Sequence, residues 1–344
     1  MDEQTVILLI GYLAGLFMAF NIGANDASNP TQTAVGSGAL TLRQAIIMFS
    51  IFAAIGALAQ GYMVIKTVGK GIVELSDLAG AIAAVLGAGL WILIATYKGL
   101  PVSTTHSIVG AVLGVGLSYL ALGVITLSDI KFYVLFSIVL SWLTSPLVSI
   151  ILAIILYRLF TNITFKYGKN TRRMEKIFKY MIIVSLLFSA YSFGANDVAN
   201  ATGVYVVITS RYMGLPSRET MLVLSALGSI GIALGAFTLG RRVINTVAFR
   251  ITRLDYISGA AAGYANALAV WLFTTLPHMI IGYGMPISTT HASVSAVIGV
   301  GLAKKGLSTI DVKTVLMILV GWLLTLPVSA LLSFTLHQIL YNLI

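Results

Sequence analysis

The stretch NIGANDASN at residues 21–29 decides the fold, because it occurs again as SFGANDVAN at residues 192–200. Two other segments recur in the same order. VIKTVGKGI (64–72) returns as VINTVAFRI (243–251), and PVSTTHSIVGAVLGVGL (101–117) returns as PISTTHASVSAVIGVGL (286–302), the latter identical at 12 of 17 positions. Similar offsets and a preserved order indicate an internal duplication. We predict two transmembrane repeats, residues 1–156 and 177–344, joined by a basic linker at 157–176.

The composition around these repeats is that of a membrane protein. Of the 344 residues, 58% are hydrophobic and 9% are charged. Apolar stretches recur at close to the length of about 20 residues that a helix needs to cross the hydrocarbon core, and they lack the alternation of a transmembrane β-barrel. We therefore predict an all-α polytopic fold. Its ten expected spans are Val6–Phe20, Ala45–Val64, Leu78–Thr96, Val102–Leu122, Phe132–Leu156, Ile177–Phe193, Met221–Leu239, Ile257–Thr275, Ile287–Ala303 and Val312–Leu336.

Five expected spans in each half make an odd number, so the second half should enter the membrane in the opposite orientation. With the basic linker on one side, 16 of the 21 lysines and arginines fall on that side and five on the other. The positive-inside rule then places the linker in the cytoplasm and both termini outside a cell membrane. The net charge of +10 is explained by these loops and does not indicate nucleic-acid binding. Inverted repeats with broken helices at the membrane midplane are typical of secondary transporters.

Asp26 and Asp197 are the two acidic residues, of 11 in the chain, that fall within the apolar regions. They occupy the same place in the two repeats. A carboxylate within the membrane costs at least about 2.5–3.5 kcal/mol, so it is a functional candidate by default. Polar packing against the backbone is the alternative, and the symmetric pairing of the two aspartates argues against it.

Around each aspartate the sequence predicts a break in the helix. Gly23 and Gly194 are expected to loosen the backbone, and asparagine-aspartate pairs can bond freed main-chain groups. In the first copy, Ser28 is expected to cap a new helix with Pro30 at its start. Unwound carbonyls, amide oxygens and a carboxylate would suit a small hard cation. The expected cation ligands are Asn25, Asp26, Asn196 and Asp197.

The Pro-x-Ser-Thr-Thr-His motif is expected to start a helix in each half, with Ser103 and Ser288 as N-caps. The first backbone amides of such a helix are free donors, and together with the helix dipole they favour an anion. The expected anion ligands are Ser103, Thr104, Thr105, Ser288, Thr289 and Thr290. Back-bonding of serine and threonine within the helix is the alternative. His106 and His291 could donate to the substrate or pack against a neighbouring helix, and the sequence leaves both interpretations open. His278 and His337 are given no role.

No lysine or arginine is expected in the middle of a span, so an anion would meet two aspartates without a basic partner. These charges would repel strongly in a low-dielectric cavity. Cations must therefore enter with the anion. The residues predict cation-coupled symport of an anion, with no resident cofactor.

Together with TAVGSGALTLRQA (33–45) and GRRVINT (240–246), the paired motifs resemble the inorganic phosphate transporter family of sodium- or proton-coupled symporters. The resemblance covers nearly the whole chain. It implies import of inorganic phosphate, an inverted-repeat core and a homodimer. It also implies cation sites at the asparagine-aspartate pairs and phosphate at the Ser-Thr-Thr segments.

Two departures from the family pattern are visible. Ala53 and Ala81 stand where animal-type relatives carry glutamates that help coupling, which leaves the coupling ion open. The long cytoplasmic domain of some relatives is missing, as in a compact prokaryotic member. Three other functions are alternatives. A sulfate or other oxyanion symporter would use the same helix ends. An intramembrane hydrolase would need one asymmetric site, and a channel would need rings of charge along a pore.

Overall fold

A computed structural model describes residues 3–68, 72–75, 77–167, 171–213, 217–281 and 287–342. Within these ranges all regular secondary structure is helical. Two short 3-10 helices, η1 and η2, follow the helices that carry the Ser-Thr-Thr segments. The helices are α1 (Glu3–Asp26), α2 (Ser28–Gly36), α3 (Leu42–Val68), α4 (Leu78–Tyr97), α5 (Thr104–Ala121), η1 (Leu127–Asp129), α6 (Phe132–Tyr167), α7 (Thr171–Met213), α8 (Arg218–Thr238), α9 (Gly240–Phe249), α10 (Tyr256–Ile281), α11 (Thr289–Lys305), η2 (Gly306–Thr309) and α12 (Val312–Tyr341).

Each of the ten expected spans corresponds to one long helix, so the all-α polytopic fold is confirmed. Seven helices of the described part are long and apolar enough by themselves to cross a membrane. The short helix α2 is the new helix expected around Pro30, whereas the short helix α9 was not expected. The segment 157–176 is mostly helical, because α6 runs on to Tyr167 and α7 begins at Thr171. The described basic residues of the expected linker therefore sit on the ends of two long helices.

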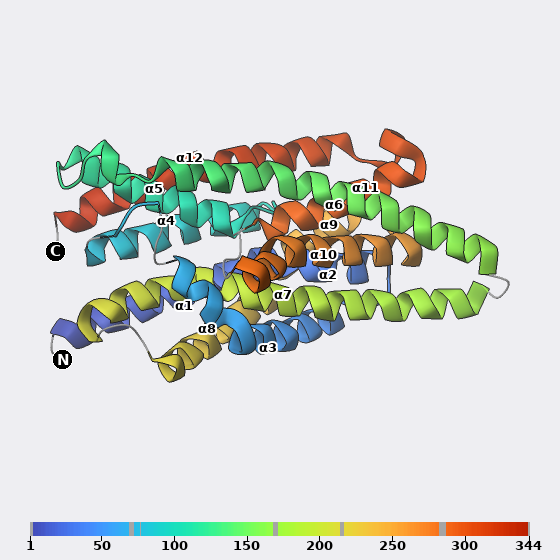
Figure 1. Ribbon diagram of the computed structural model, residues 1–344, viewed down its shortest axis with the longest axis horizontal. Coiled ribbons are helices and arrows are strands. Elements are labelled where there is room, and N and C mark those ends of the chain that lie inside the picture. The colour runs from blue at the N-terminus through green and yellow to red at the C-terminus, as the bar shows by residue number, and fades with distance from the viewer. Residues whose placement is uncertain are drawn as a thin grey trace.

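The directions of the helices agree with an inverted duplication. In Figure 1, α1 begins and α12 ends at one end of the molecule, whereas α6 ends and α7 begins at the opposite end. The helices α6 and α12 hold the same place in the two halves, and they run in opposite directions.

Each half packs mainly against the other half. Helix α3 packs against α7, and α1 packs against α8. Helices α4 and α5 form an antiparallel hairpin that packs on α12, and α10 and α11 form a hairpin that packs on α6. We call α4, α5 and α12 the first hairpin bundle, and α6, α10 and α11 the second hairpin bundle. Each bundle thus joins a hairpin from one half to the last helix of the other half.

Glycines allow the close crossings between the halves. A Cβ on Gly23 would overlap the carbonyl oxygen of Ile232 in α8, and a Cβ on Gly194 would overlap that of Ala53 in α3. These glycines were expected to loosen the backbone, and that interpretation is wrong. Both lie inside helices, where they let two backbones approach, as small residues do in membrane helix pairs.

Candidate functional site

The expected helix break at the first aspartate is a single-residue turn. Helix α1 ends at Asp26, and Ala27 keeps helical dihedrals (φ −55°, ψ −21°) with its amide donating to the Gly23 carbonyl at 3.3 Å. Ala27, in place of Ser28, is the N-cap of α2, and the Ser28 hydroxyl donates back to the Asn25 carbonyl at 2.9 Å. The expected Ser28 cap is therefore wrong.

In the second half the expected break is absent, because α7 continues as a helix through residues 191–200. The backbone carbonyls there remain in helical hydrogen bonds. An oxygen cage at this place must therefore come from side chains. The helices that do stop inside the protein are those of the two hairpins.

The N-caps expected for the hairpin helices are confirmed. The Ser103 hydroxyl accepts the amide of His106 at 3.2 Å, and the Ser288 hydroxyl accepts the amide of His291 at 3.1 Å. The first amides of each helix were expected to be free for an anion, and for the two histidine amides that expectation is wrong because the caps occupy them. Helix geometry leaves the threonine amides that precede them without intrahelical partners.

Asn25 fixes the tip of the first hairpin. Its Nδ2 donates to Thr96 Oγ1 at 2.9 Å and to the Leu100 carbonyl at 3.0 Å, and its Oδ1 accepts the Val102 amide at 3.0 Å. The turn itself passes through Gly99, whose φ of +68° favours glycine. Asn25 therefore holds the loop that precedes the Ser-Thr-Thr segment against the end of α1.

Asp26 receives hydrogen bonds from both halves of the chain. Thr104 Oγ1, at the start of α5, donates to Asp26 Oδ2 at 2.8 Å. Thr290 Oγ1, at the start of α11, donates to Asp26 Oδ1 at 3.0 Å. The two hairpin tips therefore meet on one carboxylate.

Asp197 has a corresponding but looser set of donors. Asn200 Nδ2 donates to its Oδ1 at 3.1 Å, and Thr289 Oγ1 donates to its Oδ2 at 3.4 Å. Asn200 also reaches Thr105 Oγ1 at 3.5 Å. Asn196 is buried beside them. All ten candidate residues expected from the sequence are buried, and they come together at the two hairpin tips.

Asn29 belongs to this cluster, although the sequence analysis did not select it. Its Nδ2 donates to Thr289 Oγ1 at 3.2 Å and Thr290 Oγ1 at 3.1 Å. Its carbonyl accepts from Asn266 Nδ2 at 3.3 Å and from Ser293 Oγ at 2.9 Å. Asn29 thereby ties the start of α2 to α10 and α11.

The signal that could have found Asn29 is the repeat itself. Asn29 and Asn200 hold the same position in NIGANDASN and SFGANDVAN. Each asparagine touches a threonine of the opposite half's hairpin. A matched polar residue one helical turn after each aspartate marks the same helix face.

Three residues from the sequence analysis remain to be placed. Pro286 and the side chain of His278 fall outside the described residues. His337 is buried, with its Nδ1 2.6 Å from Ser118 Oγ and its Nε2 3.5 Å from Asp77 Oδ2. This pair ties the start of α4 to α12, away from the aspartates.

Two buried carboxyl groups dominate the electrostatics of the cluster. Asp26 and Asp197 have no solvent-exposed surface, and in the described part of the chain neither forms an ion pair with a lysine or arginine. Two desolvated carboxylates cannot both stay charged without compensation. Ala53 and Ala81 are buried and add no further carboxylate. The side-chain oxygens around the aspartates are the ligand type that hard cations prefer.

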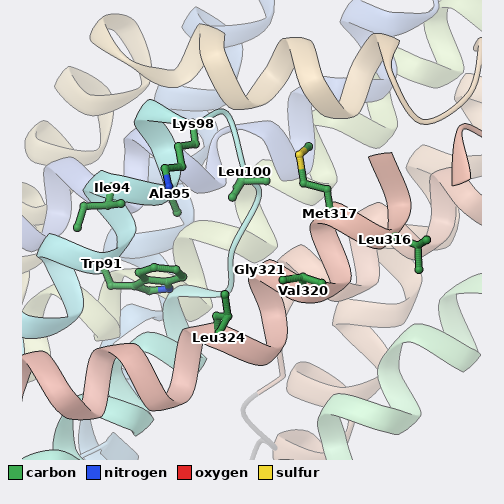
Figure 2. A pocket seen from close by; sticks show the side chains of 10 residues that line it. All are labelled: Trp91, Ile94, Ala95, Lys98, Leu100, Leu316, Met317, Val320, Gly321 and Leu324. Carbon is green, nitrogen blue, oxygen red and sulfur yellow. The ribbon is translucent and has the colours of Figure 1, made fainter. Parts of the chain in front are cut away.

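A groove of about 310 Å³ between α4 and α12 lies beside the first hairpin (Figure 2). Its lining is apolar apart from Lys98. It includes none of the ten candidate residues, although Leu100, whose carbonyl accepts from Asn25, forms part of its wall. An apolar wall offers an anion no donors, so the paired motifs and not this groove form the candidate site.

Helical spans, two buried carboxylates and two meeting hairpin tips define the protein as a membrane transporter. A model of the phosphate transporter family matches residues 22–333. A Pyrococcus abyssi protein named "Putative phosphate permease" is 33% identical over 97% of this chain and 98% of its own length. The chloroplastic inorganic phosphate transporter 2-1 of Arabidopsis thaliana is 29% identical over 93% of this chain and 70% of its own.

A solved structure described as "The sodium-dependent phosphate transporter" resembles the fold, with a TM-score of 0.84 and 30% identity over 98% of this chain and all of the other. The chain therefore belongs to the phosphate transporter family. The family suggested by the sequence motifs is thus confirmed, and the protein is a transporter and not an intramembrane hydrolase.

Proposed function

We propose that the protein is a secondary symporter that imports inorganic phosphate together with sodium. The observation that carries this proposal is the meeting of Thr104 and Thr290 on Asp26, because it places an anion-binding helix end from each half next to one cation ligand. The sodium-dependent transporter of similar fold supports the choice of sodium.

In this proposal, sodium and phosphate bind to groups that are hydrogen-bonded to each other in the structure. Sodium binds the carboxylates, and phosphate binds the hydroxyls that donate to them. In the structure, the Thr104 and Thr290 hydroxyls donate hydrogen bonds to Asp26. Sodium bound at Asn25 and Asp26, and at Asn196 and Asp197 in the other half, takes up the carboxylate lone pairs. The threonine hydroxyls are then free to donate to an anion. Sodium therefore binds first and prepares the phosphate site, which couples the two ions.

Phosphate is held between the two hairpin tips. Backbone amides at the starts of α5 and α11 supply donors and the helix dipoles add a favourable field. Hydroxyls complete the shell from Ser103, Thr104, Thr105, Ser288, Thr289 and Thr290. Because the site lacks a basic side chain, the charge of the anion is compensated by the co-transported cations.

The proposed setting is a cell membrane, with both termini outside, the basic ends of α6 and α7 in the cytoplasm, and two chains forming a homodimer. The count of basic residues supports this orientation.

Uptake of labelled phosphate into proteoliposomes tests the function. A sodium gradient and a pH gradient are imposed separately. We expect the inward sodium gradient alone to drive accumulation above equilibrium, with excess sulfate failing to compete. Accumulation driven only by the pH gradient would show that protons, and not sodium, are the coupling ion. Effective competition by sulfate would assign the protein to broader oxyanion transport.

A further inference from the structure

Two buried histidines and two half-buried tryptophans form a cluster of rings behind the hairpin tips. The ring of His106 stacks on Trp142 with a centroid distance of 3.4 Å, and His291 stacks on Trp322 at 3.8 Å. The two histidine rings meet edge to face at 4.4 Å. Trp322 Nε1 also donates to the Pro101 carbonyl at 3.0 Å. The stacks hold the two hairpin tips against one another.

Both stacks cross the boundary between the two hairpin bundles. His106 in α5 belongs to the first bundle, and its partner Trp142 is in α6 of the second. His291 in α11 belongs to the second bundle, and its partner Trp322 is in α12 of the first. Because the crossing is reciprocal, the bundles cannot shift at the tips without separating both stacks.

The histidines contact their neighbours mainly through ring stacking, and His291 Nδ1 also lies 3.5 Å from the Trp142 carbonyl oxygen, within its own bundle. The Nε2 atoms of His106 and His291 are buried and have no hydrogen-bond partner among the described residues. Each histidine follows the threonines of its motif, yet its ring lies against a tryptophan and not against an aspartate. In each motif the threonine side chains therefore lie toward the aspartates, and the histidine ring lies toward the opposite bundle.

We propose that His106, Trp142, His291 and Trp322 are positioning residues for transport, which keep the two hairpin tips in register so that Thr104 and Thr290 reach Asp26 together. We call these four residues the ring latch. The inference rests on the proposed function, because it explains how the phosphate site is assembled. It assigns the two histidines to packing across the bundle boundary.

Two measurements test the ring latch, one with and one without phosphate. The first is phosphate affinity by calorimetry in saturating sodium. The second is the distance distribution between spin labels at Ser128→Cys in η1 and Ser308→Cys in η2, one beside each hairpin. The native chain has no cysteine, so labelling is confined to these positions.

We expect Trp142→Ala and His106→Ala to broaden the distance distribution and to weaken phosphate binding about three- to tenfold, the range of an aromatic pair. Trp142→Phe and His106→Phe keep a ring and should restore both properties. The matched control is Trp91→Ala, because Trp91 also packs between helices but donates to Thr325 within the first bundle. This control should lower thermal stability and leave both readouts unchanged.

The outcomes separate the latch from the function. If Trp142→Ala and Trp322→Ala both leave the distances and the affinity at the parent values, the ring latch is wrong. If His106→Phe fails like His106→Ala, the ring nitrogens are needed and the packing role is overturned. If the parent binds no phosphate while the distances still respond, the latch stands and the proposed function fails.

Discussion

At the scale of single residues, Asp26 accepts a hydrogen bond from one hydroxyl in each half of the chain. A carboxylate has enough lone pairs for both, but sodium bound to it would need the same oxygens. These two hydrogen bonds partly offset the cost of burying the Asp26 carboxyl group. In the proposed mechanism, sodium would replace them.

Replacing either aspartate by asparagine should uncouple phosphate from sodium. The amide would retain the shape of the side chain but not the charge that offsets a dehydrated cation, a change worth about 3–5 kcal/mol for a buried pair. We expect Asp26→Asn and Asp197→Asn to raise the sodium concentration for half-maximal phosphate binding at least about 100-fold. Calorimetry at stepped sodium concentrations measures this shift.

The control for these variants is Asp129→Asn, an exposed carboxylate that caps η1. It should leave the sodium dependence unchanged. A parental sodium response in Asp26→Asn or Asp197→Asn, in protein that elutes normally on size exclusion, would remove that residue from the cation site.

Removing a site hydroxyl should weaken phosphate binding by similar amounts in the two halves. We expect Thr104→Ala and Thr290→Ala to raise the dissociation constant about 10- to 150-fold, because a lost hydrogen bond to a charged group is worth about 1.5–3 kcal/mol. Thr144→Ala is the control, since that hydroxyl bonds back to the Leu140 carbonyl within α6. Unchanged binding in one site variant would show that its half gives no side chain to the anion.

At the scale of elements, the site is positioned by two matched helix crossings. On one, Gly194 and Gly56 place α7 against α3, and on the other, Gly23 and Gly235 place α1 against α8. In each crossing both glycines face a carbonyl oxygen of the partner helix. The aspartates follow three residues after Gly23 and Gly194, so these crossings set their depth.

A methyl group at these crossings should force the helices apart. We expect Gly23→Ala and Gly194→Ala to destabilise the protein by at least the 1–3 kcal/mol or so typical of overpacking, because the new Cβ meets backbone and not a movable side chain. Thermal unfolding of purified protein in detergent measures the loss. Gly240→Ala should be neutral, since the nearest atom to its Cβ would be 3.8 Å away. If both crossing variants unfold at the parent temperature, the helices can move apart at these crossings without loss of stability.

The sequence predicted the ten long helices, the caps at Ser103 and Ser288 and the clustered residues, but not how neighbouring helices meet. Spans and the caps at Ser103 and Ser288 depend on local pattern, so they could be predicted directly. Gly23 and Gly194 were misinterpreted because a glycine in a helix has the same local signal whether it bends the chain or faces a carbonyl. Asn29 and the tryptophans were missed because only the folded chain brings their partners beside them, from the opposite half or across a bundle boundary.

At the scale of the whole molecule, the two 3-10 helices offer a matched test of orientation. Ser128 in η1 and Ser308 in η2 are both exposed, and each follows the Ser-Thr-Thr helix of its half. If the halves are inverted with the termini outside, Ser128→Cys should react with an impermeant maleimide on intact cells. Ser308→Cys should react only after permeabilisation. Labelling of both cysteines from outside would contradict the inversion. Labelling of Ser308→Cys but not Ser128→Cys on intact cells would place the termini in the cytoplasm.

The packing of the first hairpin on the last helix of the other half has a consequence for biosynthesis. The hairpin of α4 and α5 packs on α12, yet the ribosome must translate all of residues 122–311 before α12 begins. At about 5–20 residues per second, this leaves the hairpin without its partner for roughly 10–40 s. During that interval Ser333 is not yet made, so the small-residue surfaces around Gly87 and Gly114 face lipid or a chaperone. A chain that stops before α12 would remain in that unfinished state and be exposed to membrane quality control.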